Sequence, residues 1–274
     1  MAAVGSVAVV LTAVGVGPMR TAAARPPLIA VFGDSLTVEA RDDLDNWASL
    51  RGAEVMFLGA SGTAPCDALP TMRSLARSSR RPAAVVVAYS GNYVTPGMSD
   101  RMPERRAGDP AVGTLSAADI EALVRSYRDD LTEVAEIWAA RPVVFVEAPP
   151  ASGPRWDGDP LATRLEVVRA VTGEVGRESG RPVVDSAGDY TIGGRSSAVV
   201  PCGPLDGCAG FARVRNADGL HFCPSEAMAI GTGTLEDLVR SRCADDRGRP
   251  IPSVGARRYA RILLDAGMSL LTTR

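Results

Sequence analysis

Residues 28–36 read LIAVFGDSL, a run of five apolar residues followed by a glycine, an aspartate and a serine. Apolar residues at consecutive positions predict a strand buried on both faces, as in a parallel sheet covered by helices. Four more short apolar runs follow, with helical patterns between them. This alternation predicts a single α/β domain over residues 25–274. The predicted strands are Leu28–Phe32, Val55–Leu58, Ala84–Ala88, Val143–Val146 and Val183–Val184.

The clearest helical pattern begins at Ser116, which can cap a helix together with Asp119 three residues later. Apolar side chains then recur at helical spacing as far as Trp138. Segments 94–115 and 186–217 are rich in glycine, proline or small residues, so they are predicted as long surface loops near the functional edge of the domain. The other predicted helices are at 68–78, 160–178, 226–241 and 254–271.

The composition excludes several kinds of chemistry. The chain of 274 residues has 30 basic and 32 acidic side chains, and its net charge of −2 does not suit a nucleic-acid partner. Every basic side chain is an arginine, so lysine-based Schiff-base chemistry and phosphate-binding P-loops are ruled out. The only histidine is His221, which excludes a metal site built from several histidines.

The first 24 residues resemble a secretory signal. Residues 2–17 are apolar, and the small residues at 21–24 suit a cleavage site near Ala24. No positive side chain precedes Arg20, which either a longer N-terminus or an uncleaved membrane anchor would explain. We therefore exclude 1–24 from the fold and expect a secreted or cell-envelope protein, with a membrane-anchored one as the alternative.

The chain has five cysteines, a number that fits an oxidising compartment. Cys202 and Cys208 enclose a short Gly/Pro loop and are predicted to form a local disulfide. Because the number is odd, one cysteine must stay unpaired or pair between chains. A structural zinc held by Cys202, Cys208, His221 and Cys223 is the competing interpretation, although its spacings match no familiar zinc pattern.

Small polar residues follow the first three predicted strands. Ser35 comes directly after the first strand, Gly62 follows the second, and Asn92 follows the third. Because ligands of open α/β sheets bind outside the carboxyl ends of the strands, these residues should lie at one edge. The Ser35 and Gly62 amides and the Asn92 side chain could then stabilise an oxyanion. Alternatively, Asp34 or Ser35 caps a helix, and Gly62 and Asn92 serve turn geometry.

A second candidate motif, Asp218-Gly219-Leu220-His221, lies late in the chain. A serine hydroxyl is a poor nucleophile until a neighbouring base takes its proton, and histidine suits that task near neutral pH. A carboxylate three residues before the histidine can hold its other ring nitrogen and stabilise the imidazolium. Ser35, His221 and Asp218 are therefore the candidate nucleophile, base and orienting acid.

Taken in order, Gly33-Asp34-Ser35-Leu36, Gly62, Gly91-Asn92 and Asp218-x-x-His221 resemble the four sequence blocks of the SGNH/GDSL hydrolase family. The resemblance covers essentially residues 27–241. One departure is that the third block commonly reads Gly-x-Asn-Asp, whereas here Asn92 follows Gly91 directly.

The resemblance implies a flavodoxin-like three-layer α/β/α sandwich with a parallel sheet of about five strands. It implies a serine esterase with Ser35, His221 and Asp218 as catalytic residues, and with Ser35, Gly62 and Asn92 as the oxyanion hole. The reaction would pass through an acyl-enzyme and need no cofactor or metal.

Two other functions stay open from the sequence. One is an acyltransferase that passes the acyl group to a sugar or glycolipid hydroxyl, and the other is a non-catalytic envelope-binding protein on the same fold. Aromatic residues make up only 5% of the chain, and segment 94–115 contains no apparent apolar lid, which favours short acyl esters of small molecules or envelope glycans. Four arginines in predicted loops are either contacts for an anionic substrate or solvated surface: Arg101, Arg105, Arg106 and Arg155.

Overall fold

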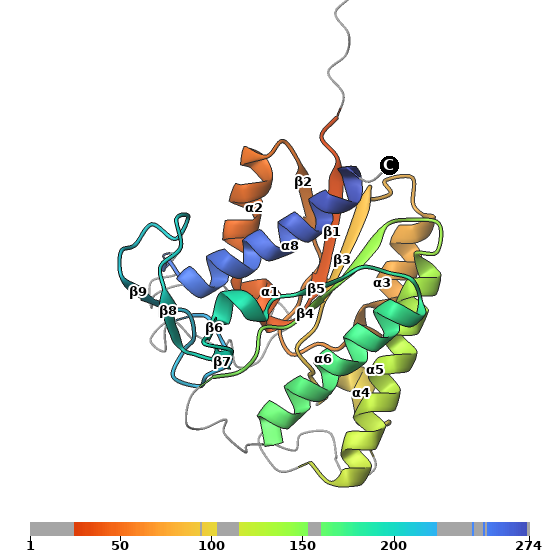
Figure 1. The fold of residues 1–274 in the computed structure, drawn as a ribbon. Coiled ribbons are helices and arrows are strands. Elements are labelled where there is room, and N and C mark those ends of the chain that lie inside the picture. Colours follow the sequence, from red (N-terminus) through yellow and green to blue (C-terminus); the bar gives the residue numbers. More distant parts are fainter. Residues whose placement is uncertain are drawn as a thin grey trace, which may run out of the picture.

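The structure is a computed structural model that describes residues 25–93, 95–102, 115–152, 160–223, 243, 249 and 251–272. Its centre is a five-stranded parallel sheet in the order β2-β1-β3-β4-β5 (Figure 1). The strands are β1 (Leu28–Gly33), β2 (Glu54–Phe57), β3 (Ala84–Ala88), β4 (Val143–Glu147) and β5 (Val183–Asp185).

Helices cover both faces of this sheet, so the predicted three-layer α/β/α arrangement is confirmed (Figure 1). Along β1, Ile29 and Val31 enter the core shared with α2 and α8, whereas Ala30 and Phe32 enter the core shared with α3, α5 and α6. The apolar residues of β1 therefore fill both cores. The helices are α1 (Ser35–Glu39), α2 (Arg41–Leu50), α3 (Pro65–Arg77), α4 (Pro96–Ser99), α5 (Ala117–Ile137), α6 (Pro160–Glu178) and α8 (Val254–Thr272).

The strand order fixes where a site can form. The chain moves from β1 outward to β2 and then crosses back over β1 to β3, so the direction of winding reverses between β1 and β3. Loops that leave the carboxyl ends of two such strands diverge and open a crevice between them. The turns after β1 and β3 flank this point, and the turn after β2 lies beside them.

All five predicted strands are present, each to within one residue of its predicted ends. Ser116 caps α5, and its hydroxyl accepts a hydrogen bond from the Asp119 backbone N–H at 3.1 Å. Helix α3 begins three residues earlier than predicted, because Pro65 suits the first turn and the Asp67 carboxylate accepts from the Ala64 N–H at 2.8 Å. The predicted helix at 226–241 and the N-terminal segment 1–24 lie outside the described residues.

Segment 186–217 holds more regular structure than the predicted loop. A 3₁₀ turn at Ala187–Tyr190 is followed by two short antiparallel pairs. Sequences of two or three residues per strand carry no recognisable period, which is why the prediction was a loop. The pairs are β6 (Thr191–Ile192) with β7 (Arg195–Ser196) and β8 (Val199–Pro201) with β9 (Phe211–Arg213).

Two disulfides form among the five cysteines. The predicted bond between Cys202 and Cys208 is confirmed, and a second joins Cys223 to Cys243. Cys66 is the free cysteine and is half-buried. Because three of the four proposed zinc ligands are oxidised in these bonds, the zinc interpretation is wrong.

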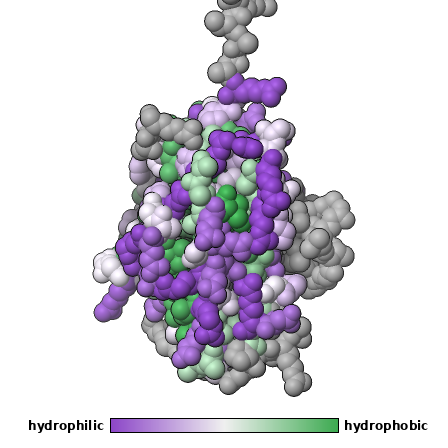
Figure 2. Space-filling view, turned by 90° about the vertical axis from the view of Figure 1, so that its right-hand side faces the viewer, coloured by the Kyte–Doolittle hydropathy of each residue, from purple (hydrophilic) through white to green (hydrophobic). Residues whose placement is uncertain are grey.

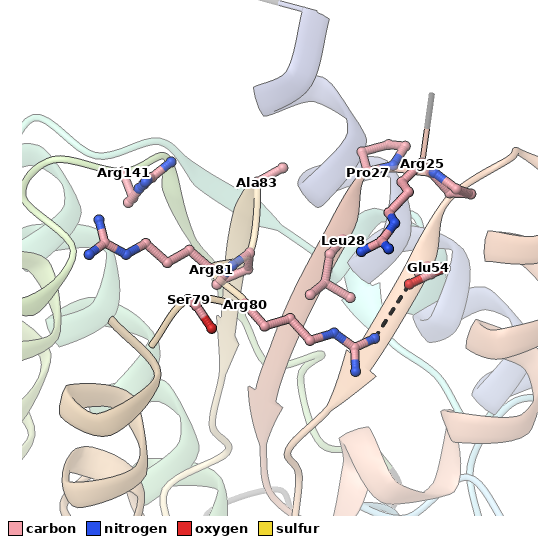
Figure 3. A pocket seen from close by; sticks show the side chains of 11 residues that line it. Arg25, Pro27, Leu28, Glu54, Ser79, Arg80, Arg81, Ala83 and Arg141 are labelled. Carbon is pink, nitrogen blue, oxygen red and sulfur yellow. Dashed lines mark hydrogen bonds and ion pairs between the residues drawn. The ribbon is translucent and has the colours of Figure 1, made fainter. Parts of the chain in front are cut away.

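One cavity lies at the opposite edge of the sheet from Ser35. It measures about 540 Å³ and sits where β1 and β3 begin, with Arg80 forming an ion pair with Glu54 at 3.5 Å (Figure 3). Its other charged side chains belong to Arg25, Arg81 and Arg141. No predicted site residue lines it.

Hydrophilic side chains also predominate on the face shown in Figure 2, which is the right-hand side of Figure 1. Ion pairs link the helices α3, α5 and α6, among them Arg73–Glu133, Arg128–Glu174 and Arg128–Glu178.

In the part of the chain that the structure describes, no helix has the length and apolar character needed to cross a membrane.

Candidate active site

The structure brings Ser35, His221 and Asp218 together in one chain of contacts. The Ser35 Oγ lies 3.2 Å from the His221 Nε2, and the His221 Nδ1 lies 2.7 Å from the Asp218 Oδ2. Residues 186 positions apart in the chain thus meet beside the carboxyl end of β1. The imidazole retains 20% and the Asp218 side chain 29% of their exposure, so a small molecule in solution can reach the group.

The charges around His221 favour its protonated form. Burial lowers the pKa of His221, but the hydrogen bond to Asp218 and the negative charges of Glu39, Asp218 and Asp34 raise it above its ordinary value of 6.5 overall. For Asp218, burial raises the pKa, but the hydrogen bond from His221, the charge of His221 and the backbone N–H donors of Leu220 and His221 together lower it below its ordinary value. Asp218 is therefore held as a carboxylate that can stabilise an imidazolium.

Ser35 is positioned by the turn that joins β1 to α1. Asp34 caps this short helix, its Oδ1 accepting from the Leu36 N–H at 3.2 Å, so the capping role considered for Asp34 is real. Ser35 is the first residue of α1. Gly33 allows α1 to approach β3, because a Cβ at Gly33 would lie 2.0 Å from the Thr37 Oγ1 and 2.4 Å from the Ala88 carbonyl oxygen.

The other oxygen of Asp34 connects this turn to the turn after β3. The Asp34 Oδ2 accepts from the Ser90 N–H at 2.5 Å and from the Ser90 hydroxyl at 2.6 Å. Asp34 is fully buried, and burial raises its pKa. A buried carboxylate is tolerated where several donors satisfy it, so Asp34 fixes the two strand-end turns relative to each other. Sequence reasoning missed this role because no local pattern links Asp34 to Ser90.

Asn92 also belongs to this network. Its Nδ2 donates to the Thr63 carbonyl oxygen at 3.0 Å and lies 3.3 Å from the Asp34 Oδ2. The amide therefore joins the turns after β1, β2 and β3. Both of its hydrogens have acceptors in the protein, and the contact with Asp34 is the longer one. The predicted role of Asn92 as an oxyanion donor requires that longer contact to give way, and it stays a prediction.

Gly62 lies in the turn after β2 and is exposed. Its φ of +70° is one that L-amino acids with a side chain rarely adopt, so the turn favours glycine there. A Cβ would meet no atom within 4 Å, so conformation and not space is what selects the residue. The turn is closed by a hydrogen bond from the Thr63 hydroxyl to the Ala60 carbonyl oxygen at 2.7 Å. A donor role for the Gly62 N–H stays a prediction.

The turn that carries His221 is braced on both sides. On one side, the buried Arg215 guanidinium donates to the Leu220 carbonyl oxygen and, at 2.9 Å, to the Pro150 carbonyl oxygen, and it lies over the ring of Phe222. Burial lowers the pKa of Arg215 to about 10. On the other side, the Glu39 carboxylate accepts from the Phe222 N–H at 2.6 Å. The sequence carries no local signal for either brace.

Of the four loop arginines, Arg101 lies within the described residues. It forms an ion pair with Asp130 at 2.8 Å and so joins the turn that follows α4 to α5. Arg105, Arg106 and Arg155 lie outside the described residues. Among the described residues, no cluster of three or more His, Cys, Asp or Glu side chains could hold a metal ion.

The chain is similar to several solved structures. An alpha/beta hydrolase enzyme from the metagenome of Lake Arreo, Spain, aligns over 89% of this chain and 96% of its own, with 15% identity and a TM-score of 0.50. The lipase/acylhydrolase from Enterococcus faecalis aligns over 78% and 94%, with 20% identity and a TM-score of 0.47. A GDSL-like lipase from Bacteroides thetaiotaomicron aligns over 72% and 82%, with 15% identity and a TM-score of 0.44.

The likeness to the Lake Arreo enzyme agrees with the predicted fold, a parallel five-stranded α/β/α sandwich. No family model and no curated protein matches the chain.

Proposed function

We propose that this chain is a serine hydrolase of the SGNH/GDSL type that cleaves carboxylic esters. The observation that carries the proposal is the continuous contact from the Ser35 hydroxyl through the His221 ring to the Asp218 carboxylate, at 3.2 and 2.7 Å. A nucleophile within hydrogen-bond reach of a base that a third group orients is the general signature of nucleophilic acyl transfer. The sequence blocks and the shared fold support the same class.

In the first half-reaction, the Ser35 oxygen attacks the ester carbonyl carbon while the His221 Nε2 takes the hydroxyl proton. Asp218 stabilises the imidazolium through its contact with Nδ1. The negative charge on the former carbonyl oxygen is stabilised by the Ser35 and Gly62 N–H groups and by Asn92, whose longer contact with Asp34 is the one an oxyanion would replace. The bond to the alcohol oxygen then breaks, and the alcohol leaves with the proton from His221.

In the second half-reaction, a water molecule attacks the acyl-Ser35 ester, and the His221 Nε2 takes a proton from it. The tetrahedral intermediate collapses, Ser35 regains its proton from the imidazolium, and the carboxylic acid leaves. The same base therefore serves both halves of the cycle.

The proposed substrates are short acyl esters, such as acetyl esters of small molecules or of envelope glycans. The low aromatic content of the chain supports this choice. The two disulfides favour an oxidising compartment, and with the apolar N-terminal segment they support export from the cytoplasm.

The deciding experiment replaces the nucleophile. Ser35→Ala should lower kcat for p-nitrophenyl acetate by at least about 10³-fold, because the proposed nucleophilic oxygen is removed. Ser49→Ala, at an exposed position of α2, is the matched control and should keep full activity. A fluorophosphonate probe should label the wild type and the Ser49→Ala protein but not the Ser35→Ala protein. Full esterase activity in a folded Ser35→Ala protein would reject the proposed function.

A further inference from the structure

Glu39 lies one helical turn after Ser35 at the end of α1. Its Oε2 accepts hydrogen bonds from two consecutive backbone N–H groups, that of Phe222 at 2.6 Å and that of Cys223 at 3.3 Å. These are the two residues that directly follow His221. One short helix therefore carries the proposed nucleophile at its start and, at its end, a carboxylate that holds the main chain of the proposed base.

Burying the Glu39 carboxylate costs free energy, so its negative charge is expected to have a role. Burial raises the pKa of Glu39, and the charge of His221 and the two backbone donors oppose that rise. Burying a carboxylate requires compensation, and a neutral acceptor could satisfy the same N–H groups without that cost. The charge itself is therefore the feature that needs an explanation.

The side chains around Glu39 show which group its negative charge acts on. His221 faces three carboxylates, Asp218, Glu39 and Asp34, and all three raise its pKa. Arg215 is the cation on the other side of the turn and interacts with both Glu39 and Asp218. Behind Glu39 lies a cavity of about 160 Å³ that also contains charged side chains, which belong to Asp42, Asp43 and Arg257.

We propose that Glu39 is a positioning residue for His221, which fixes the main chain after the imidazole and supplies negative charge beside it. This inference rests on the proposed function for its catalytic meaning. In the part of the chain that the structure describes, Glu39 forms its hydrogen bonds with the Phe222 and Cys223 N–H groups and none with Ser35 or the His221 ring. It therefore acts on the reaction through His221. It would hold the Nε2 at the distance that Ser35 needs and stabilise the imidazolium that forms when Ser35 loses its proton.

The titration of His221 tests this directly, because the chain has a single histidine and its ring proton signal in NMR needs no assignment. Glu39→Gln keeps a side-chain oxygen for the two N–H groups but removes the charge. Loss of a nearby negative charge disfavours the imidazolium, so the pKa of His221 should fall by about 0.5–1 unit. The acidic limb of kcat/KM should move to lower pH by the same amount, since the neutral imidazole is the active form.

Glu39→Ala removes the charge and the brace together. The plateau kcat should fall about 10- to 100-fold with KM within about threefold, because a small displacement of the base affects the chemical step more than binding. In Glu39→Gln the plateau kcat should stay within about fivefold of the wild type. Asp45→Asn is the matched control, since it removes one carboxylate from an exposed position on α2, and it should leave both the titration and the plateau unchanged.

The inference is overturned if the pKa of His221 in Glu39→Gln stays within about 0.2 unit of that in Asp45→Asn, whatever Glu39→Ala does. It is also overturned if a folded Glu39→Ala protein keeps the wild-type plateau kcat. If Glu39→Ala does not fold, Glu39→Gln decides alone. Because NMR reads His221 without any substrate, the titration result stands apart from the Ser35→Ala result, which tests the proposed function itself.

Discussion

The two edges of the central sheet differ in how far their charged side chains are buried and hydrogen-bonded. At the carboxyl edge, the carboxylates of Asp34, Glu39 and Asp218 are wholly or largely buried, and each accepts at least two hydrogen bonds. At the amino edge, Arg80 lines a cavity of about 540 Å³ and is exposed, and its ion pair with Glu54 spans 3.5 Å (Figure 3). The charges at the amino edge are therefore the more weakly fixed ones.

Charges that are fixed by hydrogen bonds in a partly buried setting mark this candidate site. Charges exposed to water are screened, and a pair of them contributes about 0–1 kcal/mol. Charges held in a partly dry setting act strongly on a neighbour, as the raised pKa of His221 and the lowered pKa of Asp218 illustrate. Substitutions at the carboxyl edge should therefore change turnover, and those at the amino edge should not.

Among substitutions at the two edges, Asp218→Asn should change turnover the most. An asparagine can donate to the His221 Nδ1 and so favours the ring tautomer whose Nε2 carries the proton and cannot take one from Ser35. We expect kcat to fall by about 10²- to 10⁴-fold with KM little changed. The matched control is Asp265→Asn, which breaks an exposed ion pair with Arg51 and should keep full activity. A loss of less than about threefold would mean that another acid orients His221.

Asn92→Ala should follow with an intermediate effect. If the Asn92 amide stabilises the oxyanion, kcat should fall by about 10²-fold, the typical cost of one lost donor. The melting temperature should fall as well, because the contacts with Thr63 and Asp34 disappear. Asn46→Ala, at an exposed position of α2, serves as the control. A lower melting temperature with unchanged kcat would assign Asn92 to the turns alone.

Arg80→Ala should change turnover the least, and it tests whether the amino edge is separate from the candidate site. The variant removes an exposed ion pair at the amino edge, so the free energy of unfolding should change by less than about 0.5 kcal/mol. Its kcat/KM for p-nitrophenyl acetate should stay within about twofold of the wild type. A tenfold loss would show that the arginine-lined cavity takes part in the reaction and that the two edges are not separate.

The sequence predicts the central layer of the fold well because its signals are local. The runs that form β1, β3 and β4 are apolar at consecutive positions, and Ser116 with Asp119 marks the start of α5 unambiguously. Helix α2 was not predicted, since charged residues crowd its first turn and its buried face consists of Leu44 and Ala48 alone. The short strands of segment 186–217 depend on pairing between residues that no single stretch reveals.

The same distinction explains the candidate site. Ser35, Asp218 and His221 could be proposed because each lies in a short motif, and the geometry then brings them within contact. The partners that hold them, Glu39 and Arg215, could not be proposed. Glu39 lies in no recognisable motif. Its two hydrogen bonds are with Phe222 and Cys223, which lie 183 and 184 positions later in the chain. Tertiary contacts of this kind have no period and no spacing that a reader of the sequence could use.

The disulfide between Cys223 and Cys243 has a practical consequence for anyone who handles the protein. Cys223 lies two residues after His221, and its N–H is one of the two that Glu39 holds. Dithiothreitol or another reducing additive in the storage buffer would therefore act on the turn that carries His221. Purification without thiols, after production in the bacterial periplasm or another oxidising host, keeps that anchor closed, and thiol-releasing thioester substrates are best avoided in kinetic work.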